Sequence, residues 1–172
     1  MDNHAKINVE LVSLSEVTYM EVRHAKESDW LMVKDLLLLM GDMDDAEAAK
    51  ERFLSCIDNE QHFIPVAVTT KTVVGYGWAQ DCGFHLRTGE KTSKLHDLFV
   101  HPEYRHNGIA TSLFSAIKEW ADNNETSGLQ WNASPSATKF YKKAGINPLM
   151  EEEYYRAFEL KYTRLKLKLT QS

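Results

Sequence analysis

Leu95-His96-Asp97-Leu98-Phe99-Val100-His101-Pro102 and the residues after it, Glu103-Tyr104-Arg105-His106-Asn107-Gly108-Ile109-Ala110, decide the fold of this 172-residue chain. The first half is rich in strand-forming residues and ends at Pro102, which has no N–H for a ladder bond. From Ile109 to Trp120 apolar residues recur at helical spacing. The stretch therefore predicts a strand, a tight loop and a helix.

Gly108 stands where the predicted loop becomes the helix. A residue without Cβ adopts backbone angles that others resist and lets a ligand approach the main chain. The first N–H groups of a helix have no internal partners, and the helix dipole favours anions there. The loop therefore predicts a diphosphate site. It lacks the Gly-Lys-Ser/Thr end of a Walker loop and the glycine spacing of a dinucleotide fingerprint.

Length and composition indicate one globular domain. Of the 172 residues, 43% are hydrophobic and 26% charged, and no apolar run approaches the ~20 residues that span a bilayer. The N-terminus carries no apolar signal core, which predicts a cytoplasmic protein without a membrane partner. The spacing of Cys56 and Cys82 favours neither a disulfide framework nor a zinc site. A net charge of −5 argues against nucleic-acid binding.

The rest of the chain alternates strand and helix patterns around this central stretch. Residues 7–12 alternate as an edge strand or a loose arm, and residues 81–93 read as a long polar loop. Gly75 and Gly77 are expected to leave room for a bulge or a close ligand. The other predicted elements are strands at 18–23, 63–68, 72–79, 128–132, 154–160 and 163–169, and helices at 31–40, 46–57 and 135–144.

Two motifs resemble those of the GNAT superfamily of N-acetyltransferases. Arg105-His106-Asn107-Gly108-Ile109-Ala110 is similar to its acyl-CoA loop, and residues 131–146 are similar to its signature Asn-x-x-Ala-x-x-Phe-Tyr-x-Lys-x-Gly-Phe. In that signature Ser134 replaces the Asn and Ile146 replaces the last Phe. From the loop alone, a structural strand-to-helix turn in another α/β domain stays open. Residues 78–81 and 85–90 resemble aminoglycoside-modifying members.

The resemblance implies a fold and a co-substrate. The fold is α/β (α+β), one domain over residues 1–172 with a core of about 18–160, built as a mixed twisted sheet with helices on both faces. The co-substrate is acetyl-CoA, and no metal is implied. The residues expected to bind it lie on the central strand, the loop, the first helical turn and the second motif: Leu98, Phe99, Val100, Arg105, His106, Asn107, Gly108, Ile109, Ala110, Thr111, Ser112, Asn132, Ser134 and Tyr141.

Two catalytic groups are predicted. Tyr141 matches the family's tyrosine, which implies the acid that protonates the leaving thiolate, although an amphipathic packing role stays open. Asp97 is the preferred base, since the family often carries a carboxylate there. His96 should point to the opposite face of the strand because side chains alternate, and a satisfied core histidine is the alternative role.

The predicted function is transfer of acetyl to a primary amine of a small cationic acceptor, an aminoglycoside-type antibiotic or a polyamine, by direct attack. The acidic segment 41–47 either faces that amine or caps a helix through Asp44 or Asp45. Glu151, Glu152 and Glu153 either border the acceptor cleft or form a solvent-exposed charged run. The alternatives are a non-catalytic acyl-CoA sensor, a longer acyl chain, or a protein or peptide amine. A homodimer is a further expectation, from the alternating pattern of both ends of the chain.

Overall fold

The computed structural model describes residues 7–13, 16–70 and 72–147. They belong to two compact units, residues 1–133 and 134–172, and each is described by itself. The predicted strands at 154–160 and 163–169, and the run Glu151, Glu152 and Glu153, lie outside the described residues.

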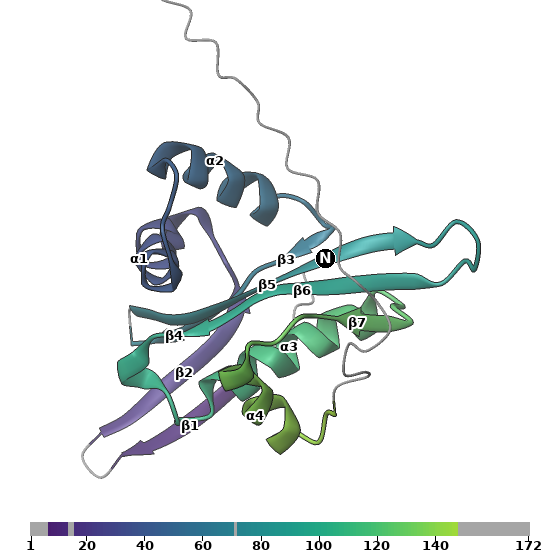
Figure 1. The fold of residues 1–172 in the computed structure, drawn as a ribbon. Coiled ribbons are helices and arrows are strands. Elements are labelled where there is room, and N and C mark those ends of the chain that lie inside the picture. Colours follow the sequence, from purple (N-terminus) through teal and green to yellow (C-terminus); the bar gives the residue numbers. More distant parts are fainter. Residues whose placement is uncertain (1–6, 14–15, 71, 148–172) are drawn as a thin grey trace, which may run out of the picture. The chain divides into compact units, whose positions relative to one another are not determined.

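The first unit is a mixed sheet with helices (Figure 1). The strand order is β1-β2-β4-β5-β6-β7, and β3 also pairs with β5. The β6–β7 pair is parallel and the other pairs are antiparallel. Its elements are β1 (Ile7–Ser13), β2 (Glu16–His24), η1 (Glu27–Asp29), α1 (Trp30–Met40), α2 (Ala46–Ile57), β3 (His62–Phe63), β4 (Pro65–Thr69), β5 (Thr72–Phe84), β6 (Lys91–Val100), η2 (Pro102–Tyr104), α3 (Ile109–Asn123) and β7 (Gly128–Gln130).

Helices cover both faces of the sheet, as predicted. On one face α3 lies against the backbone of β5, where a Cβ on Gly77 would come within 2.7 Å of Ile117 Cδ1. On the other face Val33 and Phe53, from α1 and α2, form a core cluster with Tyr76 of β5. Gly75 and Gly77 therefore make room for the packing of α3. The expected bulge is present at Gly75, because Ala67 of β4 pairs with Gly75 and Val68 pairs with Val73, which leaves Val74 as an extra residue.

The sheet also corrects the expectation for residues 81–93. They are no polar loop: β5 continues to Phe84 and β6 begins at Lys91, so only a short turn separates the strands. Lys91 Nζ lies 2.9 Å from the Asp81 carboxylate and forms an ion pair across the hairpin. The hairpin is polar, so the alternation of apolar and polar residues that marks a strand is weak there. Residues 7–12 form the edge strand β1, paired antiparallel with β2.

A buried ion pair fixes the start of α1. Asp29, with a side chain only 4% exposed, accepts two hydrogen bonds from the Arg23 guanidinium, at 2.6 and 2.9 Å, and one from the Lys26 N–H at 2.8 Å. Burial opposes ionisation of this carboxylate, but these donors outweigh it and lower the pKa of Asp29. The pair joins β2 to the helix that borders the candidate site.

We expect Asp29→Ala to destabilise the protein by about 2 to 3 kcal/mol, because charged hydrogen bonds are lost and the part-buried Arg23 guanidinium loses its carboxylate partner. Because the folded-state pKa of Asp29 is depressed, its contribution should be full above the unfolded pKa and disappear as pH falls through the folded one. Urea unfolding across pH checks this. Asp44→Ala breaks the geometrically similar but exposed pair with Arg52, 2.6 Å apart, and should cost much less. Equal losses would contradict the prediction.

The second unit contributes one described helix, α4 (Pro135–Lys143). Ser134 is its N-cap, with Oγ accepting from the Ala137 N–H at 3.2 Å, and Pro135 occupies the first helical position. Gly145, at φ 80°, follows its end, as predicted. Of the helices in the described ranges, none combines the length and the apolar character needed to cross a membrane.

Candidate functional site

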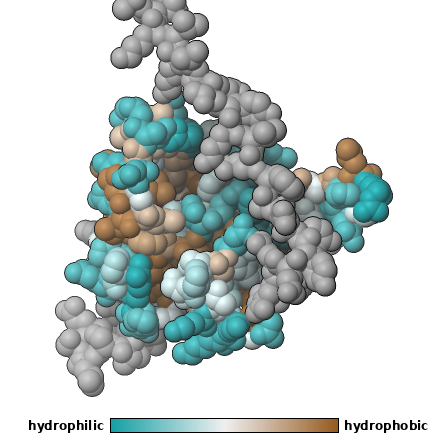
Figure 2. All heavy atoms as spheres, in the orientation of Figure 1, coloured by the Kyte–Doolittle hydropathy of each residue, from teal (hydrophilic) through white to brown (hydrophobic). Residues whose placement is uncertain are grey.

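A cavity of about 570 Å³ lies between the α1–α2 layer and the sheet of the first unit. Its volume falls within the range of small-molecule sites. Figure 2 shows apolar surface gathered over the region of α1 and beneath α2. The described residues that line it are Val33, Leu37, Met40, Gly41, Asp42, Met43, Asp44, Ala49, Arg52, Phe53, Cys56, Ile64, Tyr76, Trp78 and Asp97.

A bulge in β6 shapes the polar end of this cavity. Trp78 of β5 pairs with Asp97, but the next residue of β5 pairs with Leu95, so His96 is an extra residue in its strand. Alternation is broken there, and His96 and Asp97 both lie on the α1–α2 face. The His96 ring stacks on Trp78 with centroids 4.2 Å apart, while Asp97 approaches Tyr76, two positions away on the same face of β5. The expectation that His96 points to the opposite face is therefore wrong.

Asp97 is a half-buried carboxylate at the cavity wall. The Tyr76 hydroxyl lies 3.3 Å from its Oδ2 and 2.9 Å from the sulfur of Met40. Burial raises the pKa of Asp97, against the opposing effects of the Tyr76 hydrogen bond and of His96. Burial, reinforced by the Asp97 charge, also raises the pKa of Tyr76 far above its ordinary value. A raised pKa makes the ionised carboxylate a stronger proton acceptor, which is the property that a general base needs.

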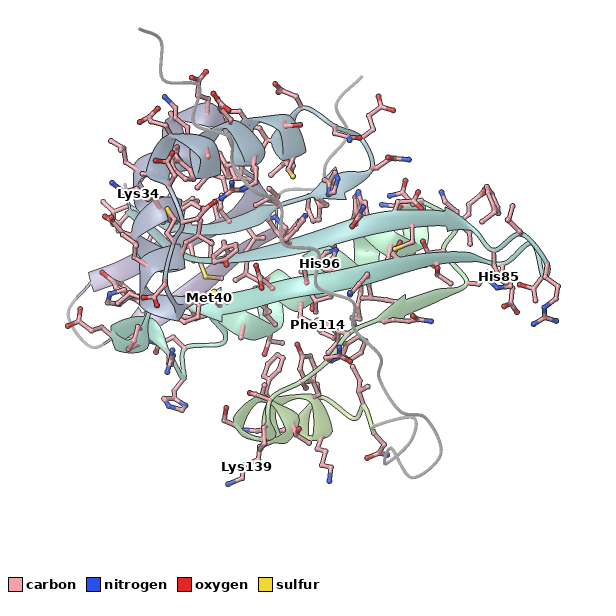
Figure 3. The ribbon with its side chains drawn as sticks, turned by 45° about the horizontal axis from the view of Figure 1, so that its top comes forward. Lys34, Met40, His85, His96, Phe114 and Lys139 are labelled. Atoms are coloured by element: carbon pink, nitrogen blue, oxygen red, sulfur yellow. The ribbon has the colours of Figure 1, made fainter. Side chains whose placement is uncertain are left out.

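His96 sits in a chain of aromatic and amide groups along β5. Its Nε2 lies 2.9 Å from Gln80 Oε1, so with the amide assigned this way Nε2 carries the hydrogen and Nδ1 is the basic nitrogen. Trp78 Nε1 in turn donates to His62 Nδ1 at 3.1 Å. Burial, with Lys94 adding to it, lowers the pKa of His96. Figure 3 labels His96 midway along the strands and His85 at the far end of the hairpin.

The edge of β6 is open beside the cavity. Its pairing with β7 covers only Thr92 to Lys94, so among the described residues no strand pairs with that edge at Leu98, Phe99 and Val100. The main-chain groups of these residues that face away from β5 therefore have no strand partner among the described residues. The Val100 carbonyl accepts a hydrogen bond from Arg105 Nε at 3.0 Å. The Arg105 guanidinium also lies 5.5 Å from the Phe99 ring centroid, which anchors the loop to the strand.

The predicted anion loop has the expected backbone. Gly108 is the N-cap of α3 at φ 77° without a side-chain cap, and His106 is also left-handed at φ 67°. The first intrahelical bond is Ser112 N–H to the Gly108 carbonyl at 3.0 Å, so the preceding N–H groups of the first turn lack intrahelical acceptors. Asn107, Ala110 and Thr111 complete this turn region. Ile109 is 1% exposed, so only its backbone can serve the loop.

The second motif divides between the two units. Asn132, which follows β7, is exposed. Ser134, which stands where the family motif has Asn, accepts the Ala137 N–H with its hydroxyl and so caps the helix. Tyr141 lies on α4 and is buried, and burial raises the pKa of its hydroxyl. A phenol with a raised pKa holds its proton at neutral pH.

Sequence reasoning missed several residues of this site. Tyr76 and Trp78 are two residues apart in a predicted strand, so their side chains share one face of the sheet. The spacing does not show that this face borders the cavity, which both residues line. Met40 was predicted only as the last residue of a helix.

Among the described residues no group of three His, Cys, Asp or Glu side chains is placed to hold a metal ion.

Comparison with known proteins assigns the sequence to a family. The model of the acetyltransferase (GNAT) domain matches residues 41–169. The uncharacterized N-acetyltransferase YjcF of Bacillus subtilis (strain 168) is 29% identical over 101 residues, which make up 59% of this chain and 66% of that protein. The match thus spans just under two thirds of this relative's length.

Solved structures share the fold. Glucosamine-6-phosphate N-acetyltransferase from Arabidopsis thaliana has a TM-score of 0.69 at 16% identity, over 81% of this chain and 99% of that one. Aminoglycoside N-acetyltransferase AAC(6')-Iy in complex with CoA has a TM-score of 0.71 at 17% identity, over 84% and 99% of the two chains. A further structure of AAC(6')-Iy, with a bisubstrate analog, has a TM-score of 0.69 at 17% identity, over 81% and 98%.

Proposed function

The chain belongs to the GNAT acetyltransferase family. We propose that it is an N-acetyltransferase of that type, which transfers acetyl from acetyl-CoA to a primary amine of a small cationic acceptor. The observation that carries the acceptor site is the Asp97 carboxylate, half-buried at the wall of a ligand-sized cavity beside the open edge of β6. The aminoglycoside acetyltransferases among the fold relatives make aminoglycosides one class to test, with polyamines as the other.

The cofactor side of the proposal uses the strand, the loop and the helix. Main-chain groups at Leu98, Phe99 and Val100 would hold the pantetheine arm along the open edge of β6. The N–H groups at the start of α3, with the left-handed Gly108 at their head, would hold the diphosphate. The Arg105 guanidinium, fixed by Val100 and Phe99, adds a positive charge next to that loop.

The chemistry asks two proton transfers of the chain. An alkylamine is mostly protonated at pH 7, with a pKa of about 10.4, so a base must take its proton before nitrogen attacks the thioester carbonyl. We assign that role to Asp97, whose environment favours proton uptake. The N–C bond forms and the C–S bond breaks, and in this proposal the Tyr141 hydroxyl gives its proton to the thiolate. The second proton, which nitrogen loses as the amide forms, restores the Tyr141 phenol through solvent water, and Asp97 passes its proton to solvent. Backbone N–H groups of β6 would stabilise the oxyanion.

We expect Tyr141→Phe to lower kcat by about 100-fold, the size of a general-acid contribution, while acetyl-CoA binding is kept. The measurement pairs CoA release, followed with a thiol reagent, with the thermal shift caused by acetyl-CoA. A non-catalytic acyl-CoA sensor would show the thermal shift but no turnover in either form. Unchanged kcat in the variant would remove Tyr141 from the mechanism.

The experiment that tests the function is CoA release from acetyl-CoA across aminoglycosides, polyamines, amino acids and short peptides. Saturable turnover with one class of amine supports the proposal. No turnover with any amine, together with an intact acetyl-CoA thermal shift, would favour the sensor. Cytoplasmic location, a homodimer and a role in antibiotic resistance stay predictions.

A further inference from the structure

We infer that the acceptor cavity selects a monoamine with an apolar body, an aryl or branched alkyl group, over a polyhydroxylated or polycationic amine. This inference rests on the proposed function: it keeps a primary amine as the acceptor and favours a monoamine over the aminoglycosides and polyamines named there. It is carried by the side chains that line the cavity and by the way their charges are paired.

The walls of the cavity are predominantly apolar. The apolar and sulfur-containing residues come from α1, α2, the loop between these helices and the residue between β3 and β4: Val33, Leu37, Met40, Met43, Ala49, Phe53, Cys56 and Ile64. Burial raises the pKa of the Cys56 thiol, so it is a neutral wall group. Burying the apolar part of a ligand against this surface is favourable. The hydroxyl groups of a polyhydroxylated ligand would lose their hydrogen bonds to water and find few hydrogen-bond partners in the walls, which is unfavourable.

The charges at the cavity leave little for a second ammonium group. Asp44 binds the Arg52 guanidinium through two contacts, at 2.6 and 3.3 Å, and this hydrogen bonding lowers the pKa of Asp44 to about 2. Asp44 and Arg52 therefore largely neutralise each other. Asp42 also lines the cavity but is exposed, so among the described lining carboxylates that Arg52 does not pair, Asp97 is the half-buried one. One such carboxylate suits one amine.

The shape of the cavity fits the same ligand. The aromatic rings of Tyr76 and Trp78 flank the polar end next to Asp97, and the Tyr76 hydroxyl is held against Met40. An apolar cavity of about 150 Å³ already holds a benzene ring. The space of about 570 Å³ seen here accommodates an aryl or alkyl body together with its amine.

The test is a series of amines assayed by CoA release with the full chain: methylamine, butylamine, 2-phenylethylamine, spermidine and kanamycin. We expect kcat/KM to rise by at least about tenfold from methylamine to 2-phenylethylamine, the discrimination that an apolar pocket gives for a few methylenes. We also expect 2-phenylethylamine to exceed spermidine and kanamycin. Higher kcat/KM with either polycation overturns this inference and leaves the proposed function standing, whereas no turnover with any amine overturns both.

Neighbouring leucines of α1 provide a matched pair of variants. Leu37 lines the cavity, whereas Leu38 is 52% exposed and outside the lining. Leu37→Gln should lower the ratio of 2-phenylethylamine to methylamine kcat/KM by about tenfold, and Leu38→Gln should leave it unchanged. The ratio is insensitive to a loss of folded protein, because both amines are assayed on one preparation. An unchanged ratio in Leu37→Gln would contradict the placement of the apolar body.

Discussion

Gly108→Val should weaken acetyl-CoA binding by about 100-fold. The native φ of 77° is left-handed, a conformation that strains a β-branched residue, so the chain must rotate out of it at the head of α3. After that rotation the N–H groups of the first helical turn no longer point at the same place, so they cannot bind one anion together. Each lost hydrogen bond to a charged group costs about 1.5 to 3 kcal/mol, which corresponds to about a 100-fold loss of affinity. Isothermal titration with acetyl-CoA measures it directly.

Gly83 provides the matched control. It has a similar φ of 71°, and like Gly108 it has open space where a Cβ would stand. Gly83 lies near the end of β5, away from the loop before α3. Gly83→Val should therefore lose comparable folding stability but bind acetyl-CoA as the parent does. Equal affinities in the two variants would contradict the assignment of the diphosphate site.

Asp97→Asn should lower kcat by about 100-fold with little change in acetyl-CoA affinity. The amide keeps the shape of the carboxyl group and its contact with Tyr76, but it takes up no proton, and a positioned general base contributes at least about that factor. Steady-state kinetics with the best amine of the panel gives the number. Asp122→Asn, an exposed change on α3, is the control that should leave kcat unaltered.

The pH profile separates Asp97 from its neighbour His96. Burial raises the pKa of Asp97 above that of an ordinary carboxyl, about 3.9, so the acidic limb of kcat/KM should lie above that value. The active form is the ionised one, so activity rises with pH through this limb. His96→Gln should keep the limb and Asp97→Asn should remove it. The reverse outcome would make His96 the base, with Gln80 holding its tautomer.

Local patterns predicted most of the fold. The strand, loop and helix of residues 95–121, the edge strand at 7–12 and the helix at 46–57 follow from periodicity, Pro102 and the left-handed Gly108. These features act between residues close in the chain, so the sequence displays them. The hairpin at 81–93 was missed because its polar residues pair across strands, as Asp81 does with Lys91.

The site depended on contacts that the sequence does not display. The sequence by itself determined a strand, a loop and a helix that begins after Gly108, and a carboxylate at position 97 on the central strand. The tertiary structure alone decided that a bulge turns His96 to the same face as Asp97, and that the Tyr76 hydroxyl lies between the Asp97 carboxylate and the Met40 sulfur. It also decided that Asp44 is neutralised by Arg52. A one-residue bulge reverses alternation, and burial and charge pairing arise only when distant segments meet.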